Sequence, residues 1–350
     1  MSTYRDSGVD IDEGDRAVEL MKAHLARASR PEVVGGIGGF AGLFDASLLK
    51  KYSRPLLATS TDGVGTKTEF ARILNKYDTI GEDLVAMVVD DLVVCGAEPL
   101  FMTDYIAIGK VHPEKIAEIV KGIARGCEKA NTALIGGETA EHPGLMAEDE
   151  FDLAGAATGV VEADNLLGEA RVCEGDLLLA MPSSGFHANG YSLIRHIINS
   201  KDLPLDLSVP ETHSTLGEIL LIPTEIYARD CLVLMKALGN HLRAFSHITG
   251  GGIAANTERV IPKGLTAVYD RAQWKLPPEM NFLAKQGEVP LVDMERTWNC
   301  GIGMVAVIDP ESAELAMKTL AARGMKSWIA GEVMKSNEEN RSSLQGNYVL

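Results

Sequence analysis

The stretch PLFMTDYIAIGKVHPEKIAEIVKGIARGCEKANTALIGGET, residues 99–139, decides the fold class. It begins and ends with short runs of strand-forming residues. Between these runs the apolar residues recur at helical spacing, at Ile116, Ile119, Val120, Ile123 and Cys127. Strands and helices that alternate in this way favour an α/β core.

Further elements are predicted outward from this stretch. Towards the amino terminus they are a helix over 13–29, a strand at PLLATS (55–60) and a helix over about 80–95. Towards the carboxyl terminus they are strands at 151–162 and 176–184, a helix that begins at Pro223, and a closing strand, helix and strand between 304 and 333. We therefore expect a mixed α/β (α+β) fold with two domains, residues 1–170 and 171–350.

The composition limits the classes of function. The 350 residues include 49 acidic and 33 basic side chains, and a net charge of −16 disfavours nucleic acid and anionic membranes as partners. The five cysteines form no CxxC pair, which disfavours a disulfide framework and a zinc site. No apolar leader or membrane-spanning stretch is found, so we expect a cytoplasmic protein.

One glycine-containing segment, TSTDGVGTKT (59–68), groups the residue types of a phosphate site. Gly63 and Gly65 let the backbone turn and approach a ligand, Asp62 can hold Mg²⁺, and Lys67 can neutralise phosphate oxygen. The segment is not a Walker A loop, because Thr66 separates glycine from lysine. Taken alone, it is either a triphosphate site or a glycine turn with a solvated lysine.

Two adjacent acids, Asp90 and Asp91, lie on the helix expected over about 80–95. A step of 100° per residue groups Asp91 with Leu84 and Val88, so Asp91 is expected to point inward and Asp90 to be solvated. A buried carboxylate needs a cation, hydrogen-bond donors or a metal. We predict that Asp91 binds Mg²⁺ or joins a polar network, with a plain helix-end acid as the alternative.

The segment GGET (136–139) follows an apolar strand. This order predicts that Glu138 lies at the carboxyl end of the strand, where sites of α/β proteins commonly form, and that it is a second Mg²⁺ ligand. The nearby Glu141 and His142 match neither HExxH nor HxxEH, which disfavours zinc.

Other glycine loops are less specific. GGIGGFAG (35–42) fits GxGxxA, but no long buried strand precedes it, so it is a phosphate cradle, a mobile cover or a plain loop. SSGFHANGYS (183–192) suits an anionic ligand or a helix cap. HITGGGI (247–253) and RTWNCGIGM (296–304) each bring glycines beside polar residues, and each taken singly is a turn as readily as a site.

Together these segments closely resemble the phosphoribosylformylglycinamidine cyclo-ligase family, also called aminoimidazole ribonucleotide (AIR) synthetases. The resemblance runs nearly end to end and is carried by YRDSGVDID, RPEVVGGIGGF, STDGVGTKT, DLVVCGAEPLFMTDY, LIGGETAEHPG, SSGFHANGYSLIR, HITGGGI and RTWNCGIGM. It implies a homodimer whose amino-terminal domains pair through their sheets, each followed by a carboxyl-terminal α/β sandwich domain. It also implies ATP-dependent closure of formylglycinamidine ribonucleotide to AIR, with ADP and phosphate as the other products.

The resemblance further implies roles for individual residues. ATP would be bound by Lys22, Gly63, Gly65, Lys67, Gly136 and Gly137, and Mg²⁺ by Asp62, Asp91 and Glu138. The substrate and its phosphate would be covered by loops at Gly36, Gly38, Ser184, His187, Asn189, Thr249, Gly250 and Gly251. Catalysis would involve His247, Lys67 and Asp62, with His247 either transferring a proton or binding substrate.

The chain departs from the family pattern at Asp90, where Asn is usual, and at Phe186 and Ala188, where Pro and Ser are frequent. The first departure bears on the number of metal ions. Related families fit less well, since a selenophosphate synthetase needs a reactive residue near the first glycine loop, and thiamine monophosphate kinases lack the segments at 183–195 and 296–304. A non-catalytic nucleotide-binding regulator would have no need to keep Asp62, Lys67, Asp91 and Glu138 together.

Overall fold

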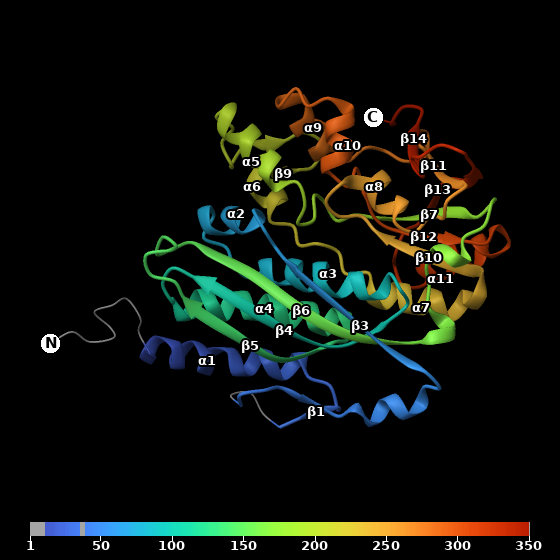
Figure 1. Ribbon diagram of the computed structural model, residues 1–350. Helices are drawn as coiled ribbons and strands as arrows, with labels where there is room; N and C mark the ends of the chain where they lie inside the picture. The colour runs from blue at the N-terminus through green and yellow to red at the C-terminus, as the bar shows by residue number, and fades with distance from the viewer. Residues whose placement is uncertain (1–10, 36–38, 350) are drawn as a thin grey trace. The chain divides into compact units, whose positions relative to one another are not determined.

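The computed structural model describes residues 11–35 and 39–349, which form two compact units. Unit 1 comprises residues 1–92 and 97–164, and unit 2 comprises residues 93–96 and 165–350. Each unit is built on one main sheet with helices packed beside it (Figure 1). Within the described parts of the chain, none of the helices combines the length and apolarity needed to cross a bilayer.

Unit 1 contains a four-stranded sheet in the order β3-β6-β4-β5. Its strands are β3 (Pro55–Gly63), β4 (Glu98–Ile108), β5 (Ala133–Glu141) and β6 (Phe151–Glu162). β4 and β5 are parallel and are joined by α4 (Pro113–Ala130), whereas the other neighbouring pairs are antiparallel. The strand, helix and strand predicted from residues 99–139 are confirmed, and they form a parallel crossover in a mixed sheet.

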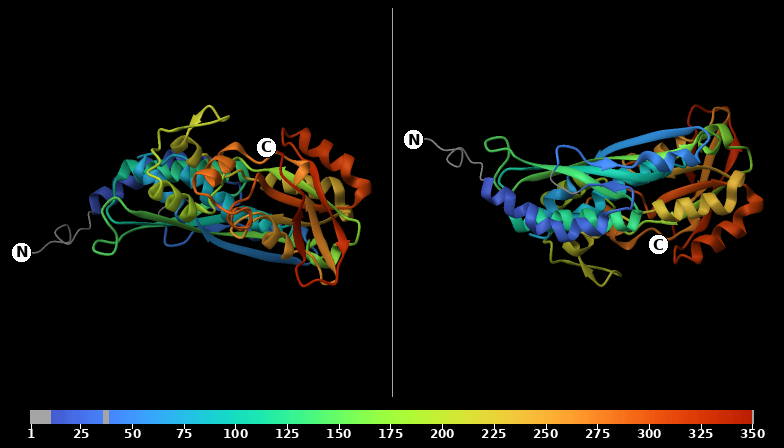
Figure 2. Two further views of the ribbon diagram at one scale, coloured as in Figure 1. Left: turned by 90° about the horizontal axis from the view of Figure 1, so that it is seen from above. Right: turned by 90° about the horizontal axis from the view of Figure 1, so that it is seen from below.

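Helices α3 (Ile80–Val93) and α4 cover one face of this sheet. A Cβ atom added to Gly155 of β6 would lie 3.4 Å from the Leu84 side chain of α3. The two helices approach closely, because a Cβ on Gly81 would lie only 2.3 Å from the Ile123 backbone nitrogen. α1 (Ile11–Leu25) runs alongside α4, as the view from below in Figure 2 shows, and α2 (Lys67–Ile73) follows β3.

The opposite face of the sheet is exposed in this protomer. Alternate residues of β3 are exposed, and the Leu57 side chain keeps 64% of its surface. On β4 the same holds for Tyr105, which is 41% exposed. We call this surface the open sheet face and define it by Leu57, Thr59, Thr61, Thr103, Tyr105 and Glu138. Its mixture of threonine and apolar side chains is typical of a sheet surface that packs against another layer.

Unit 2 contains a six-stranded sheet in the order β10-β12-β7-β13-β11-β14. Its strands are β7 (Leu177–Pro182), β10 (Leu242–His247), β11 (Leu265–Asp270), β12 (Ile302–Ile308), β13 (Trp328–Lys335) and β14 (Ser342–Gln345). Its helices are α5 (Tyr191–Ser200), α6 (Leu216–Leu220), α7 (Ala228–Leu238), α8 (Gly252–Glu258), α9 (Pro278–Gln286), α10 (Leu291–Thr297) and α11 (Ala313–Ala321). Two-stranded ribbons are formed by β1 (Val33–Val34) with β2 (Leu43–Phe44), and by β8 (Ser208–Val209) with β9 (Ser214–Thr215).

The helix predicted to begin at Pro223 is wrong, because α7 begins at Ala228. The Pro223 carbonyl instead accepts a hydrogen bond from the Ser184 hydroxyl at 2.7 Å, within a segment that has no regular structure. Proline suits an irregular connection as well as the first turn of a helix, so its position alone does not locate a helix start.

Candidate active site

The segment 59–68 leads from β3 into α2. Asp62 is the penultimate residue of β3 and is partly exposed, and its carboxylate accepts a hydrogen bond from the Gly63 N–H at 2.7 Å. Gly65 has a φ of +67°, a left-handed conformation that favours glycine. Gly63 is required by packing, since a Cβ there would lie 2.9 Å from the Leu153 carbonyl oxygen. The turn is therefore well defined and presents an accessible carboxylate.

Lys67 has a different environment from the one expected of a phosphate ligand. Its side chain is fully buried, and its ammonium group donates to the Asp83 carboxylate on α3 at 2.8 Å. Burial lowers the pKa of Lys67, and the Asp83 carboxylate opposes this effect. This contact joins α2 to α3, and binding of a nucleotide by Lys67 stays a prediction. Sequence reasoning did not identify Asp83.

The predicted orientations of Asp90 and Asp91 are wrong. Asp90 is fully buried, whereas Asp91 is exposed. The reason is that α3 is buried on all sides from Ile80 to Asp90, so it has no polar face whose phase could be deduced from the sequence. Exposure near the end of the helix leaves the Asp91 carboxylate accessible to a ligand.

The predicted position of Glu138 at the end of its strand is also wrong, because β5 continues to Glu141. Side chains alternate along a strand, and Glu138 pairs with Tyr105 on the open sheet face. Asp62, by contrast, shares its row with Gly155 and Asp104, which face the helices. Asp62 and Glu138 thus project from opposite faces of the sheet.

The predicted magnesium ligands do not come together in one protomer. Asp62 lies on β3 and Glu138 on β5, and three strand spacings separate these strands by about 14 Å. Among residues 11–35 and 39–349, no group of three or more His, Cys, Asp or Glu side chains is placed to hold a metal ion. The described part of the chain does not bring the three carboxylates together, and their binding of Mg²⁺ stays a prediction.

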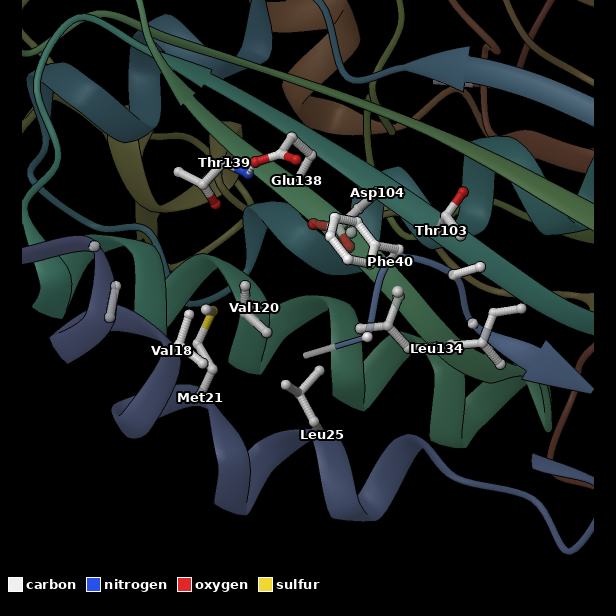
Figure 3. A pocket seen from close by; sticks show the side chains of 18 of the residues that line it. Val18, Met21, Leu25, Phe40, Thr103, Asp104, Val120, Leu134, Glu138 and Thr139 are labelled. Atoms are coloured by element: carbon white, nitrogen blue, oxygen red, sulfur yellow. Dashed lines mark hydrogen bonds between the residues drawn. The ribbon is translucent and has the colours of Figure 1, made fainter. Parts of the chain in front are cut away.

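A cavity of about 620 Å³ lies beside β5 in unit 1 (Figure 3). Gly136, Gly137 and Glu138, all predicted site residues, line it, and so does the Asp104 side chain of β4. Glycine at 137 leaves room for Asp104, because a Cβ there would lie 2.1 Å from an Asp104 carboxylate oxygen. Desolvation raises the pKa of Asp104 to about 7. Asp104 is a site candidate that the sequence analysis missed.

Asp104→Asn is expected to stabilise unit 1 at pH 8 and to have little effect near pH 4. The pKa of Asp104 is higher in the folded state than the ordinary value of 3.8, so folding favours the protonated form. This stability is present below pH 4 and is lost as the pH rises to about 7. Denaturant titrations from pH 4 to 8 measure the effect, and Glu118→Gln, an exposed change on α4, is the control. Parallel stability profiles for wild type and Asp104→Asn would contradict the expectation.

In unit 2 the loop 183–190 is tied to the segment around Asn299. The Asn299 carbonyl oxygen accepts from the Ser183 hydroxyl at 3.0 Å, and its amide donates to the Gly185 carbonyl at 2.8 Å. Within the loop, the Ser184 N–H donates to His187 Nε2 at 3.1 Å, with His187 in a left-handed conformation at a φ of 61°. The loop is therefore held in one shape before α5 begins.

Phe186, one of the departures from the family pattern, is buried and packs edge-on against Trp298 with a ring separation of 5.2 Å. Gly190 packs against the same indole, because a Cβ there would lie only 2.4 Å from the Trp298 side chain. The aromatic residue at 186 thus anchors the loop by packing against Trp298.

The glycine segment 249–252 lies beside the same loop. The Asn189 side-chain oxygen lies 3.7 Å from the position of a Cβ on Gly250. The Asn256 amide of α8 holds this segment by donating to the carbonyl groups of Thr249, Gly250 and Gly252 at 2.9–3.2 Å. Sequence reasoning missed Asn256, which lies just beyond the glycine segment on α8. The predicted residues Ser184, His187, Asn189, Thr249, Gly250 and Gly251 belong to these adjoining loops.

His247 ends β10 immediately before this segment and is only 4% exposed. Lys22, in contrast, is exposed on α1 and pairs with Glu19. Gly36 and Gly38 lie outside the described residues.

Asn256→Ala is expected to loosen the 249–252 segment. The change removes an amide that holds three carbonyl groups, so the free energy of unfolding is expected to fall by about 1–3 kcal/mol. Thermal unfolding measures this effect, and Asn281→Ala, a half-buried asparagine on α9, is the control. Equal stability of Asn256→Ala and wild type would show that the amide does not hold the segment.

Both units are similar to domains of known proteins. Residues 44–161 match the amino-terminal domain of AIR synthase related proteins, and residues 174–342 match the carboxyl-terminal domain. A phosphoribosylformylglycinamidine cyclo-ligase from Desulfitobacterium hafniense (strain DSM 10664 / DCB-2) is 48% identical over 96% of this chain and 98% of its own. The enzyme of the same description from Anaeromyxobacter sp. (strain Fw109-5) is 50% identical over 95% of each chain.

A more distant likeness extends to solved structures. A thiamine-monophosphate kinase from Stenotrophomonas maltophilia K279a superposes with a TM-score of 0.66 over 95% of this chain and 97% of that chain. Its sequence identity is 16%, so the likeness concerns the fold alone.

Proposed function

This chain belongs to the phosphoribosylformylglycinamidine cyclo-ligase family of AIR synthase related proteins, and from that premise we propose the reaction it catalyses. It closes the ring of formylglycinamidine ribonucleotide to give AIR, with conversion of ATP to ADP and phosphate. The observation that carries this proposal is the identity of 48–50% over 95–96% of the chain to enzymes of that description.

The chemistry explains the need for ATP. An amide oxygen is a poor leaving group, so the γ-phosphoryl group of ATP is first transferred to the formyl oxygen, giving an iminophosphate and ADP. A substrate nitrogen then attacks the formyl carbon, the C–O bond breaks, and phosphate leaves with the oxygen. Proton loss from the nitrogen completes the imidazole ring. The protein mainly positions the reactants and stabilises developing charge.

In unit 1 we assign Asp62 and Asp91 to the triphosphate end of ATP. Both carboxylates are accessible and can bind the Mg²⁺ that accompanies ATP and neutralises its phosphate oxygens. Glu138 does not fit the same site within one protomer. Lys67 supports the site by fixing α2 against α3 through Asp83, and Lys22 remains the exposed cation assigned to phosphate.

We assign the open sheet face to a homodimer interface. Leu57 and Tyr105 expose apolar surface there that a second copy would cover. Glu138 lies on this face, so pairing would direct it towards the second copy and into that copy's magnesium site. We place the dimer in the cytoplasm, the compartment where reduced cysteines such as Cys127 and Cys300 persist.

In unit 2 we assign the loops 183–190 and 249–252 to the phosphate and ribose of the substrate. Backbone N–H groups of these loops and the Asn189 side-chain amide can donate to phosphate oxygens, and Ser184 and Thr249 belong to the same loops. His247 stays our candidate for proton transfer, with substrate binding as its alternative.

An assay of the pure protein with formylglycinamidine ribonucleotide, ATP and Mg²⁺ tests the proposal. We expect ADP and a diazotisable aromatic amine to form in equal amounts. Asp62→Asn is expected to abolish both products, and Asp152→Asn, an exposed acid on β6, is expected to retain them. Absence of the amine product with folded wild-type protein would refute the proposed activity.

A further inference from the structure

The unit 1 cavity is mostly apolar. Figure 3 shows Val18, Met21 and Leu25 extending from α1 towards the strands, and Val120 of α4 and Leu134 of β5 complete the walls. Its volume of about 620 Å³ suits a small ring system. The exposed ring of Phe40 stands at its margin.

One carboxyl group stands out in this apolar surrounding. Asp104 lines the cavity from β4 and is partly buried, and the space for its carboxylate exists because residue 137 is glycine. The only other acid in the lining is Glu138, on the edge strand. The lining residues that the structure describes include no lysine, arginine or histidine. A desolvated carboxylate in such a place gains most from an N–H donor on a ligand.

These features favour the base of a nucleotide over its phosphate groups. The Asp104 carboxylate, with no basic residue in the described lining, repels phosphate groups, so the base of a nucleotide suits the cavity better than its triphosphate. The apolar walls favour a flat ring, and the carboxylate favours an amino group on that ring. Adenine has both properties, whereas hypoxanthine presents a carbonyl oxygen at the same position.

We propose that the unit 1 cavity binds the adenine ring of ATP and that Asp104 selects adenine by accepting a hydrogen bond from its exocyclic amino group. The proposal rests on the ATP dependence of the proposed function. It assigns Asp104 to nucleotide specificity and Gly137 to making room for its carboxylate.

Nucleotide preference tests this assignment. At pH 8, where the Asp104 carboxyl with its pKa of about 7 is mostly ionised, we expect wild-type protein to bind ATP about tenfold to a hundredfold more tightly than ITP, because ITP leaves the partly buried carboxylate facing an oxygen. Asp104→Asn is expected to reduce this preference to about threefold or less and to strengthen ITP binding, because the new amide donates to the carbonyl oxygen. Titration calorimetry with ATP and ITP measures both affinities, and Glu118→Gln on α4 is the control.

Either of two results would contradict the proposed role of Asp104. If wild type binds both nucleotides equally, or if Asp104→Asn keeps the wild-type preference, Asp104 does not select the base. Binding is measured without turnover, so a failure of AIR formation would count against the proposed activity while the binding ratio still decides the role of Asp104.

Filling the cavity provides a second test. Val18 lines the cavity and is 39% exposed, so Val18→Trp can be accommodated and is expected to weaken ATP binding at least tenfold. Leu20 lies on the same helix with 41% exposure but outside the lining, and Leu20→Trp is expected to bind ATP like wild type. Unchanged ATP affinity in Val18→Trp would show that the base binds elsewhere.

Discussion

A refolded mixture of Asp62→Asn and Glu138→Gln chains is expected to recover about a quarter of wild-type activity, although each variant alone is expected to lose activity about a hundredfold. The expectation follows from the directions of the two side chains. They project from opposite faces of the unit 1 sheet and lie about 14 Å apart across it, too far to share one ion. If Glu138 serves the partner's site, a mixed dimer contains one site with both changes and one site with neither.

The recovered fraction follows from random pairing. Equal amounts of two homodimers, unfolded and refolded together, give about half mixed dimers, and each mixed dimer has one intact site of two. AIR formation by the mixture measures recovery. Separate affinity tags on the two chains allow the mixed dimer to be purified and assayed directly, with an expected activity of about half that of wild type.

A matched pair provides the control. Asp62 and Asp91 are assigned to the same protomer's site, so a mixed dimer of Asp62→Asn and Asp91→Asn has one change in each site and is expected to stay inactive. Recovery in this control would place Asp91 in the partner's site. An inactive mixed dimer of Asp62→Asn and Glu138→Gln would show that Glu138 acts within its own protomer or has no role in the site.

The sequence predicted the elements of unit 1 well because their periodicity is strong. The apolar positions of α4 recur on one face, and β4 is rich in β-branched and aromatic residues, so local pattern and tertiary packing agree. The orientation of Asp91 could not be obtained in the same way. α3 is buried on every side from Ile80 to Asp90. Its sequence therefore contains no polar face from which the inward-pointing side of the helix could be deduced.

Contacts between residues that are distant in sequence could not be predicted, for a different reason. Asp104 matters because its carboxylate occupies the space that Gly137 leaves on the next strand, and that pairing depends on the register of β4 and β5. Register is set by the whole sheet, including the irregularity between Met102 and Thr103, and one residue of slip would place Asp104 on the open sheet face. Chemically suggestive residues could be identified from the sequence, but not the faces on which they lie.

Lys67→Met is expected to lower the free energy of unfolding by about 3–5 kcal/mol, an effect that would separate Lys67 from the ligands of the site. The Lys67 ammonium and the Asp83 carboxylate are 2.8 Å apart and fully buried. Methionine fills a similar volume but leaves the Asp83 carboxylate buried without that ammonium, and removing one partner of a buried ion pair is costly. Denaturant unfolding followed by circular dichroism measures the loss.

The double variant Lys67→Met/Asp83→Leu distinguishes a broken ion pair from poor packing. Removing both charges leaves no buried carboxylate that has lost its ion-pair partner Lys67, so the double variant is expected to be more stable than Lys67→Met alone. Additive destabilisation would contradict a coupled pair. Asp62→Asn completes the comparison, because its carboxylate is partly exposed and its loss is expected to abolish activity with little change in stability. Five residues apart in one segment, Asp62 would then act on the nucleotide and Lys67 on the fold that presents Asp62.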